Sequence, residues 1–80
     1  MRNILLIGAG RSASSLIKYL LDNSLEQNWM VTVGDISKEL ALSKTKGHER
    51  AKAIKFDVGS EIQRVREISK ADIVISMLPA

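Results

Sequence analysis

The chain has 80 residues and a formal net charge of +3; 45% of the residues are hydrophobic and 26% are charged. This length allows one small domain, and the composition is that of an ordinary globular protein. The sequence contains no cysteine, which excludes disulfide bonds and thiolate metal sites. The one histidine, His48, cannot build a metal site alone. We therefore predict no metal site.

Charge and hydropathy also narrow the classes of partner. The apolar runs are much shorter than the roughly 20 residues that a membrane-spanning helix needs. The first run ends in a glycine turn and not in a cleavage site, so we expect no secretory leader. The basic residues are dispersed, and aromatic residues do not alternate with them as in nucleic-acid-binding surfaces. We expect a cytoplasmic protein that contacts neither nucleic acid nor membrane.

Short apolar strands alternate with amphipathic helices along the chain. We expect a polar connection over 22–28, helices over 11–21, 38–46 and 61–70, and strands over 3–7, 29–33, 51–56 and 73–78. This β-α-β-α-β-α-β order predicts an α/β fold, a Rossmann-like parallel sheet covered by helices. A full doubly wound fold has about six strands. We therefore interpret residues 1–80 as a partial Rossmann-like domain, truncated from a doubly wound fold.

The first predicted strand runs directly into a glycine turn and a helix. The turn has the pattern Gly8-x-Gly10-x-x-Ala13. In a dinucleotide-binding turn, the first glycine allows the sharp bend and the second lets the backbone approach a pyrophosphate. A small third residue lets the helix pack closely on the strand. The order strand, turn, helix therefore predicts a dinucleotide site.

The residues that open the first predicted helix would meet the phosphates. The N–H groups of Arg11 and Ser12 would be free to bind phosphate oxygens, aided by the helix dipole. The alternative is a glycine turn that serves packing only.

Asp35 closes the second predicted strand and bears on the choice of cofactor. Its distance along the chain from Gly10 is close to the ~20 residues at which an acidic residue follows the glycine turn and meets the adenosine ribose. A carboxylate accepts from the ribose hydroxyls and repels a 2′-phosphate, so NAD is favoured over NADP. Lys38 could reach a 2′-phosphate, so NADP stays possible. Ile36 is included in the cofactor site. In the alternative interpretation, Asp35 only begins the turn before the next helix.

Two further strand ends complete the predicted cofactor site. Asp57 and Val58 follow the third strand, where a carboxylate could accept from the adenine amino group. Leu78 and Pro79 follow the fourth strand, at the carboxyl edge where ligands bind open α/β sheets. In the alternative interpretation, Asp57 only belongs to a turn beside a helix cap. Leu78 and Pro79 would then only form a strand end followed by a turn proline. No nucleophile, carboxylate pair or metal cluster stands out, so we predict no catalytic residue within the chain.

Several segments together resemble the N-terminal NAD(P)-binding part of the saccharopine dehydrogenase family. The resemblance covers essentially the whole chain. It rests on the segments Ile-Leu-Leu-Ile-Gly-Ala-Gly-Arg (4–11), Tyr-Leu-Leu (19–21), Val-Thr-Val-Gly-Asp (31–35), Phe-Asp-Val (56–58) and Ala-Asp-Ile-Val-Ile-Ser-Met-Leu-Pro-Ala (71–80). The closing segment, a strand ending in Ser-x-Leu-Pro, is the most specific of these.

The resemblance implies that residues 1–80 are a partial NAD(P)-binding Rossmann domain of a two-domain oxidoreductase, with the substrate domain absent from this chain. It further implies that the oxidoreductase acts on an amino-acid C–N bond in lysine metabolism. It implies cofactor contacts at the positions that match the family's motifs: Gly8, Gly10, Arg11, Ser12, Asp35, Asp57, Val58, Leu78 and Pro79. Ala13 stands where many members have glycine, and Asp35 differs from members with a basic residue nearby for NADP. The family's substrate residues lie beyond residue 80, so the isolated chain is expected to be inactive.

A second function is compatible with the same turn. Regulatory nucleotide-sensing Rossmann domains of potassium-uptake systems use a similar turn and an acidic second-strand end, without catalysis. For either function we expect a homo-oligomer, because the fourth strand would leave an unpaired edge. An amino-acid substrate is expected only for the full-length protein.

Overall fold

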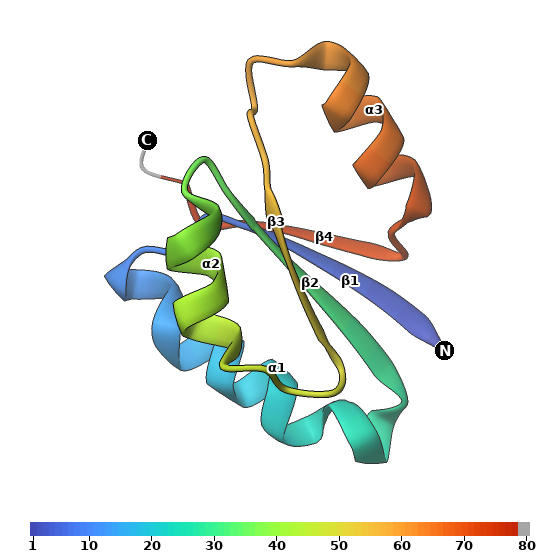
Figure 1. Ribbon diagram of the computed structural model, residues 1–80. Helices are drawn as coiled ribbons and strands as arrows, with labels where there is room; N and C mark the ends of the chain where they lie inside the picture. The colour runs from blue at the N-terminus through green and yellow to red at the C-terminus, as the bar shows by residue number, and fades with distance from the viewer. Residues whose placement is uncertain (79–80) are drawn as a thin grey trace.

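The computed structural model describes residues 1–78 and shows one parallel sheet with helices on both faces (Figure 1). The sheet has the strand order β3-β2-β1-β4. Its strands are β1 (Arg2–Ile7), β2 (Trp29–Asp35), β3 (Ala51–Lys55) and β4 (Ile73–Ser76). Every neighbouring pair is parallel. The predicted Rossmann-like α/β fold is therefore confirmed.

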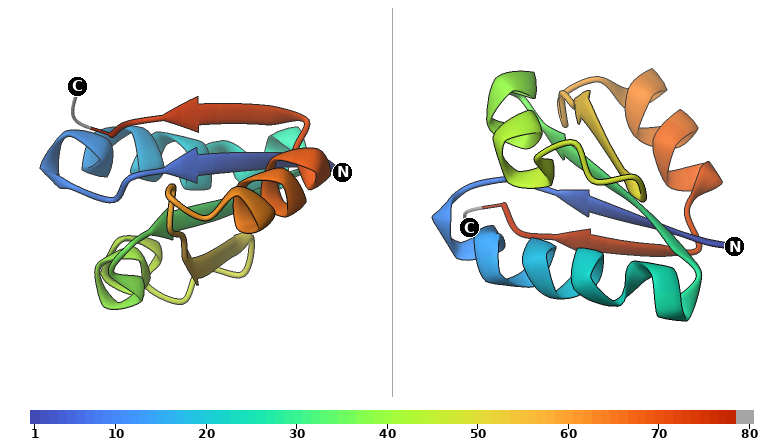
Figure 2. Two further views of the ribbon diagram at one scale, coloured as in Figure 1. Left: turned by 90° about the horizontal axis from the view of Figure 1, so that it is seen from above. Right: turned by 60° about the horizontal axis from the view of Figure 1, so that its bottom comes forward.

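The helices divide between the two faces of the sheet (Figure 2). They are α1 (Ser14–Gln27), α2 (Lys38–Thr45) and α3 (Glu61–Lys70), and a short 3-10 helix, η1 (Arg11–Ala13), precedes α1. The larger core cluster joins α1 and α2 to one face of the sheet. A smaller cluster, centred on Phe56, lies on the opposite face, which is the side of α3.

The central strand β1 is buried on both faces, as its continuous apolar run predicts. Ile4 and Leu6 face the α1 side, while Leu5 and Ile7 belong to the smaller cluster on the α3 side. All four are less than a tenth exposed. Strands covered on both faces are typical of parallel sheets, because each crossover places a helix on the sheet. Because β1 is buried up to its last residue, Ile7, the glycine turn that starts at Gly8 follows directly from the core of the sheet.

The predicted polar connection over 22–28 is wrong, because α1 continues to Gln27. Two polar residues of the predicted connection, Asp22 and Ser24, make contacts that are compatible with the helix. Lys18 Nζ donates to Asp22 one turn later at 2.6 Å, and the buried Ser24 Oγ donates to the carbonyl of Leu21 at 2.7 Å. The helix ends at Asn28, whose φ of 60° is left-handed. Asparagine tolerates this conformation better than most residues, so it provides the stop.

The remaining boundaries lie close to those predicted. Ser37 and Ser60 cap α2 and α3, and their side chains accept from the N–H groups of Leu40 and Gln63. The strand β2 continues to Asp35, two residues beyond the prediction, while β4 already ends at Ser76. The loops at the carboxyl ends of the strands are therefore slightly displaced from the predicted positions.

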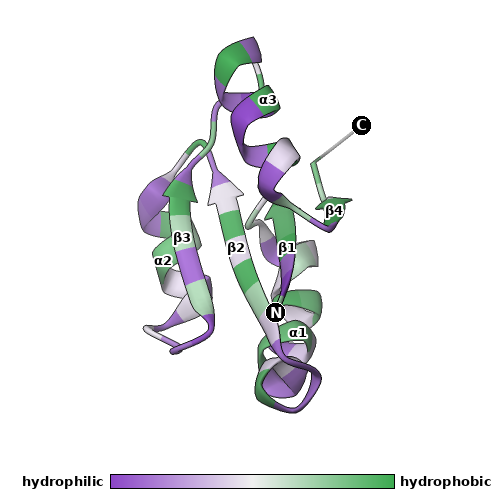
Figure 3. Ribbon diagram, turned by 90° about the vertical axis from the view of Figure 1, so that its right-hand side faces the viewer, coloured by the Kyte–Doolittle hydropathy of each residue, from purple (hydrophilic) through white to green (hydrophobic). Residues whose placement is uncertain are grey.

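One side of the molecule exposes apolar side chains. β4 pairs only with β1 and lies at the edge of the sheet, and Ile73 and Val74 are each 41% exposed. α3 contributes no buried residue, and Ile62 and Val65 are mostly exposed. Figure 3 shows these green segments of α3 and β4 on the outside of the molecule. Within residues 1–78, no helix is long and apolar enough to span a membrane.

Candidate dinucleotide-binding site

Backbone hydrogen bonds draw the carboxyl ends of the strands together around the glycine turn. The N–H of Gly8 donates to the carbonyl of Gly34 at 2.7 Å, and the N–H of Met77 donates to the carbonyl of Ile7 at 2.7 Å. The N–H of Phe56 donates to the carbonyl of Asp35 at 2.8 Å. The turn after β1 therefore lies between the ends of β2 and β4, with the end of β3 beside β2.

The two glycines of the turn are required for different reasons. Gly8 has a φ of +102°, and a β-carbon there would lie 3.1 Å from the carbonyl atoms of Met77. Both the conformation and the close approach of the β4 end favour glycine. Gly10 has a φ of −71°, and a β-carbon would meet no atom within 4 Å. Nothing within the described chain requires glycine at this position, whereas a ligand resting on the backbone would.

The turn ends in the 3-10 helix η1, which places two backbone donors at the start of the helical segment. The N–H of Ala13 donates to the carbonyl of Gly10 at 3.0 Å. No residue among 1–78 accepts from the N–H of Arg11 or Ser12. Ala13 itself is fully buried, which agrees with its predicted role in packing the helix against the sheet. The arrangement presents unpaired N–H groups to an anion, as helix N-termini do in phosphate sites.

Asp35 connects the end of β2 to the glycine turn. Its Oδ2 accepts from the N–H of Ala9 at 2.8 Å, and its Oδ1 accepts from the N–H of Ser37 at 2.9 Å. The carboxylate therefore lies beside the glycine turn, and it also begins the turn before α2, which is the position that the alternative interpretation gives it. Sequence reasoning missed Ala9 as its partner, because a backbone donor carries no residue-type signal.

Three of the other predicted site residues lie along the same edge, with exposed side chains. Ile36 is 62% exposed, Val58 41% and Leu78 42%. Asp57 Oδ1 accepts from the N–H of Gly59 at 2.9 Å, so one carboxylate oxygen serves the turn, as the cap alternative predicts. Pro79 lies outside the described residues.

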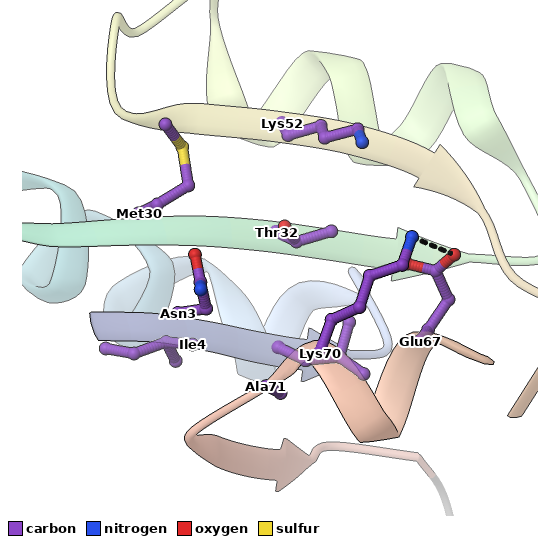
Figure 4. Close-up of a pocket in the computed structure, with 9 residues that line it drawn as sticks. Asn3, Ile4, Met30, Thr32, Lys52, Glu67, Lys70 and Ala71 are labelled. Carbon is purple, nitrogen blue, oxygen red and sulfur yellow. Dashed lines mark hydrogen bonds and ion pairs between the residues drawn. The ribbon is translucent and has the colours of Figure 1, made fainter. Parts of the chain in front are cut away.

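Two hollows of the molecule are lined by residues outside the glycine turn over 8–13. One, of about 340 Å³, lies between α3 and the amino-terminal half of the sheet, where Lys52 and Thr32 face Glu67 and Lys70 (Figure 4). The other, of about 470 Å³, lies between α1 and α2. Within residues 1–78, no cluster of three or more metal-ligating side chains occurs.

The parallel sheet, the glycine turn and the acidic end of β2 together define a Rossmann-like dinucleotide-binding domain. The family model described as the saccharopine dehydrogenase NADP binding domain matches residues 4–80. The chain therefore belongs to this family of dinucleotide-binding domains.

A solved structure gives the same assignment. The apo histidine-tagged saccharopine dehydrogenase (L-Glu forming) from Saccharomyces cerevisiae is 30% identical, with a TM-score of 0.86. The match covers 99% of the present chain but 17% of that protein. No curated protein matches the chain significantly.

The carboxylate of Asp35 offers a test of how the turn is held. Asp35→Ala leaves the Ala9 N–H without its acceptor, and we expect a loss of about 1–3 kcal/mol in unfolding free energy. Hydrogen exchange should become faster at the Ala9 amide. The matched control is Asp57→Ala, which removes one exposed turn contact and should leave the Ala9 amide unchanged. Equal protection of Ala9 in both variants would show that the turn does not depend on Asp35.

Proposed function

We propose that the chain binds a dinucleotide across the carboxyl edge of its sheet, with the pyrophosphate on the turn at Gly10. The observation that carries this proposal is the open space above Gly10, where neither φ nor packing explains a glycine. The unpaired N–H groups of Arg11 and Ser12 adjoin that space in the chain and would bind the phosphate oxygens. Ile36, Asp57, Val58, Leu78 and Pro79 would flank the remainder of the cofactor.

We propose NAD as the preferred cofactor, with NADP as the alternative. The supporting observation is the position of the Asp35 carboxylate, held beside the turn by Ala9 and Ser37. In that position it would accept from the ribose hydroxyls and repel a 2′-phosphate. The family description names NADP, and Lys38 in the first turn of α2 is the cation that would serve a 2′-phosphate.

For the whole protein we propose an oxidoreductase that acts on an amino-acid C–N bond in lysine metabolism. Family membership supports this proposal over the regulatory nucleotide sensor. When bound, the nicotinamide cofactor supplies the hydride chemistry. The residues of this chain bind and orient it: the turn holds the pyrophosphate, and Asp35 holds the ribose. Substrate contacts would come from outside residues 1–80, so we propose that the chain alone does not turn over substrate. Its chemistry on small metabolites fits a cytoplasmic location.

Cofactor binding is tested by titrating the 80-residue chain with NADH and NADPH and following nicotinamide fluorescence. We expect saturable binding and, for Gly10→Ala, an affinity lower by about tenfold or more, because the added methyl group occupies the ligand's approach.

The comparison with Gly8→Ala makes this result specific. Gly10→Ala should retain its unfolding free energy, since its φ and surroundings accept alanine, whereas Gly8→Ala should lose about 1–3 kcal/mol. Absence of saturable binding by a chain shown to be folded by circular dichroism would refute the proposed site.

Cofactor preference is read as the ratio of the NADH and NADPH dissociation constants. Asp35→Ser should move that ratio about tenfold toward NADPH, because it removes the repulsion of the 2′-phosphate. Lys38→Gln should weaken NADPH alone, by about threefold. Glu39→Gln removes a neighbouring negative charge and should change the ratio little. A ratio that is unaltered in Asp35→Ser would contradict the assignment of Asp35 to the ribose.

We also propose that the chain self-associates through β4. The supporting observations are the unpaired edge of this strand and its exposed apolar side chains. Sedimentation equilibrium should give a mass that rises with concentration. Val74→Lys places a charge on the edge and should yield the monomer, whereas Leu25→Lys, at an exposed apolar position of α1, should not. A monomeric wild-type chain at all concentrations would rule this out.

A further inference from the structure

A second, basic hollow lies between α1 and α2, separate from the glycine turn. We call it the α1–α2 groove and define it by the lining residues Ser14, Lys18, Lys44, Thr45, Lys46 and His48. Its volume of about 470 Å³ is within the range of small-molecule sites. The two helices lie side by side on one face of the sheet in Figures 1 and 2.

The cations of the groove outnumber its anions. Asp22 is the acidic residue that lines it, and its carboxylate is paired with Lys18 Nζ at 2.6 Å. Within residues 1–78, neither Lys44 nor Lys46 has a carboxylate within ion-pair distance. The groove therefore has two ammonium groups whose charge no described side chain balances.

A hydrogen bond to Ser14 fixes the position of the Lys44 ammonium group in the groove. Its Nζ donates to Ser14 Oγ at 2.5 Å, in a partly buried contact that joins α2 to the first turn of α1. A hydroxyl is a neutral acceptor, so the contact orients the ammonium group without neutralising it. Partly buried charges are stable when an opposite charge accompanies them. An anion in the groove would supply that charge.

Neutral hydrogen-bonding groups line the same hollow. His48 Nδ1 accepts from the N–H of Arg50 at 3.1 Å, so the neutral ring carries its proton on Nε2 and can donate from it. The hydroxyl groups of Ser43 and Thr45 already donate to carbonyls within α2, so His48 Nε2 is the neutral side-chain donor that the proposal uses. The buried Leu21 gives the groove an apolar wall. Two unpaired ammonium groups beside an imidazole donor suit a ligand with more than one anionic oxygen.

We propose that the α1–α2 groove binds a small multivalent anion that carries phosphate or carboxylate groups. The ammonium groups of Lys44 and Lys46 would balance its charge, and His48 would donate a hydrogen bond to it. The site is distinct from the dinucleotide turn and does not depend on it. Because Ser14 directly follows η1, the experiment must separate binding at the two places.

Nuclear magnetic resonance of the isotope-labelled 80-residue chain separates them residue by residue. The chain is titrated with inorganic pyrophosphate and, in a second arm, with citrate, both at constant ionic strength. We expect saturating shifts at the amides of Thr45 and His48, with half-saturation at about 1 mM or below. Saturation with pyrophosphate alone, citrate alone or both supports the site and identifies the anionic group that it accepts.

Matched charge variants distinguish a built site from general electrostatic attraction. The double variant Lys44→Gln/Lys46→Gln should weaken binding by about tenfold or more. The control Lys52→Gln/Lys70→Gln removes the same charge from the hollow beneath α3 and should change the affinity by less than about twofold. Lys44→Arg keeps the charge and should retain binding, which guards against a loss caused by misfolding.

Three results would overturn the proposal. Shifts at Thr45 and His48 that never saturate would show general charge attraction only. Shifts confined to the amides of Arg11 and Ser12 would assign the anion to the dinucleotide turn. An equal loss in the two double variants would mean that net charge, not the groove, determines binding. None of these results bears on whether NADH binds at Gly10, which the separate fluorescence titration measures.

Discussion

The hydrogen bond between the Asp35 carboxylate and the Ala9 N–H is the contact on which the candidate site depends. A glycine turn has little conformational preference of its own, so something outside it must select one shape. The parallel pairing of β1 with β2 brings Gly34 beside Ile7 in register, and Asp35 then reaches over the turn. The same carboxylate begins α2 through Ser37. One side chain thus sets the turn and the start of the next helix.

Much of this arrangement follows from local sequence patterns. The apolar run before Gly8 predicts a strand buried on both faces, and Ser37 and Ser60 predict helix starts, because each pattern reflects contacts within a few residues. The end of α1 could not be read in this way. Asp22 and Ser24 favour turns by type. However, Leu20, Leu21 and Ser24 are buried, and the two leucines belong to the core beneath the sheet, so the segment continues as a helix. Tertiary packing outweighed the propensity of these residues.

The candidate site shows the same division between local and distant causes. Gly8, Gly10 and Asp35 can be predicted because each residue type answers a specific backbone or ligand requirement. The contact of Lys44 with Ser14 joins positions 30 residues apart and has no motif, so the basic groove emerges only when α1 and α2 are packed side by side. Asp57 lies between these two cases. Its contact with the N–H of Gly59 is local and can be predicted from the turn, whereas its proposed contact with the cofactor can be tested only by experiment.

The weak attachment of α3 has a consequence for the dynamics of the domain. This helix buries none of its residues, and a hollow lined by Glu67 and Lys70 separates part of it from the sheet. Stability within a protein is uneven, and segments with few buried apolar contacts open at a lower free energy than the core. α3 can therefore detach from the sheet while β1, β2 and α1 remain folded. The loop at Asp57 and Val58, tied to α3 by Gln63 and Arg64, would move with it. The adenine end of the proposed site would then be more adjustable than the pyrophosphate end, where Asp35 holds the turn through the N–H of Ala9.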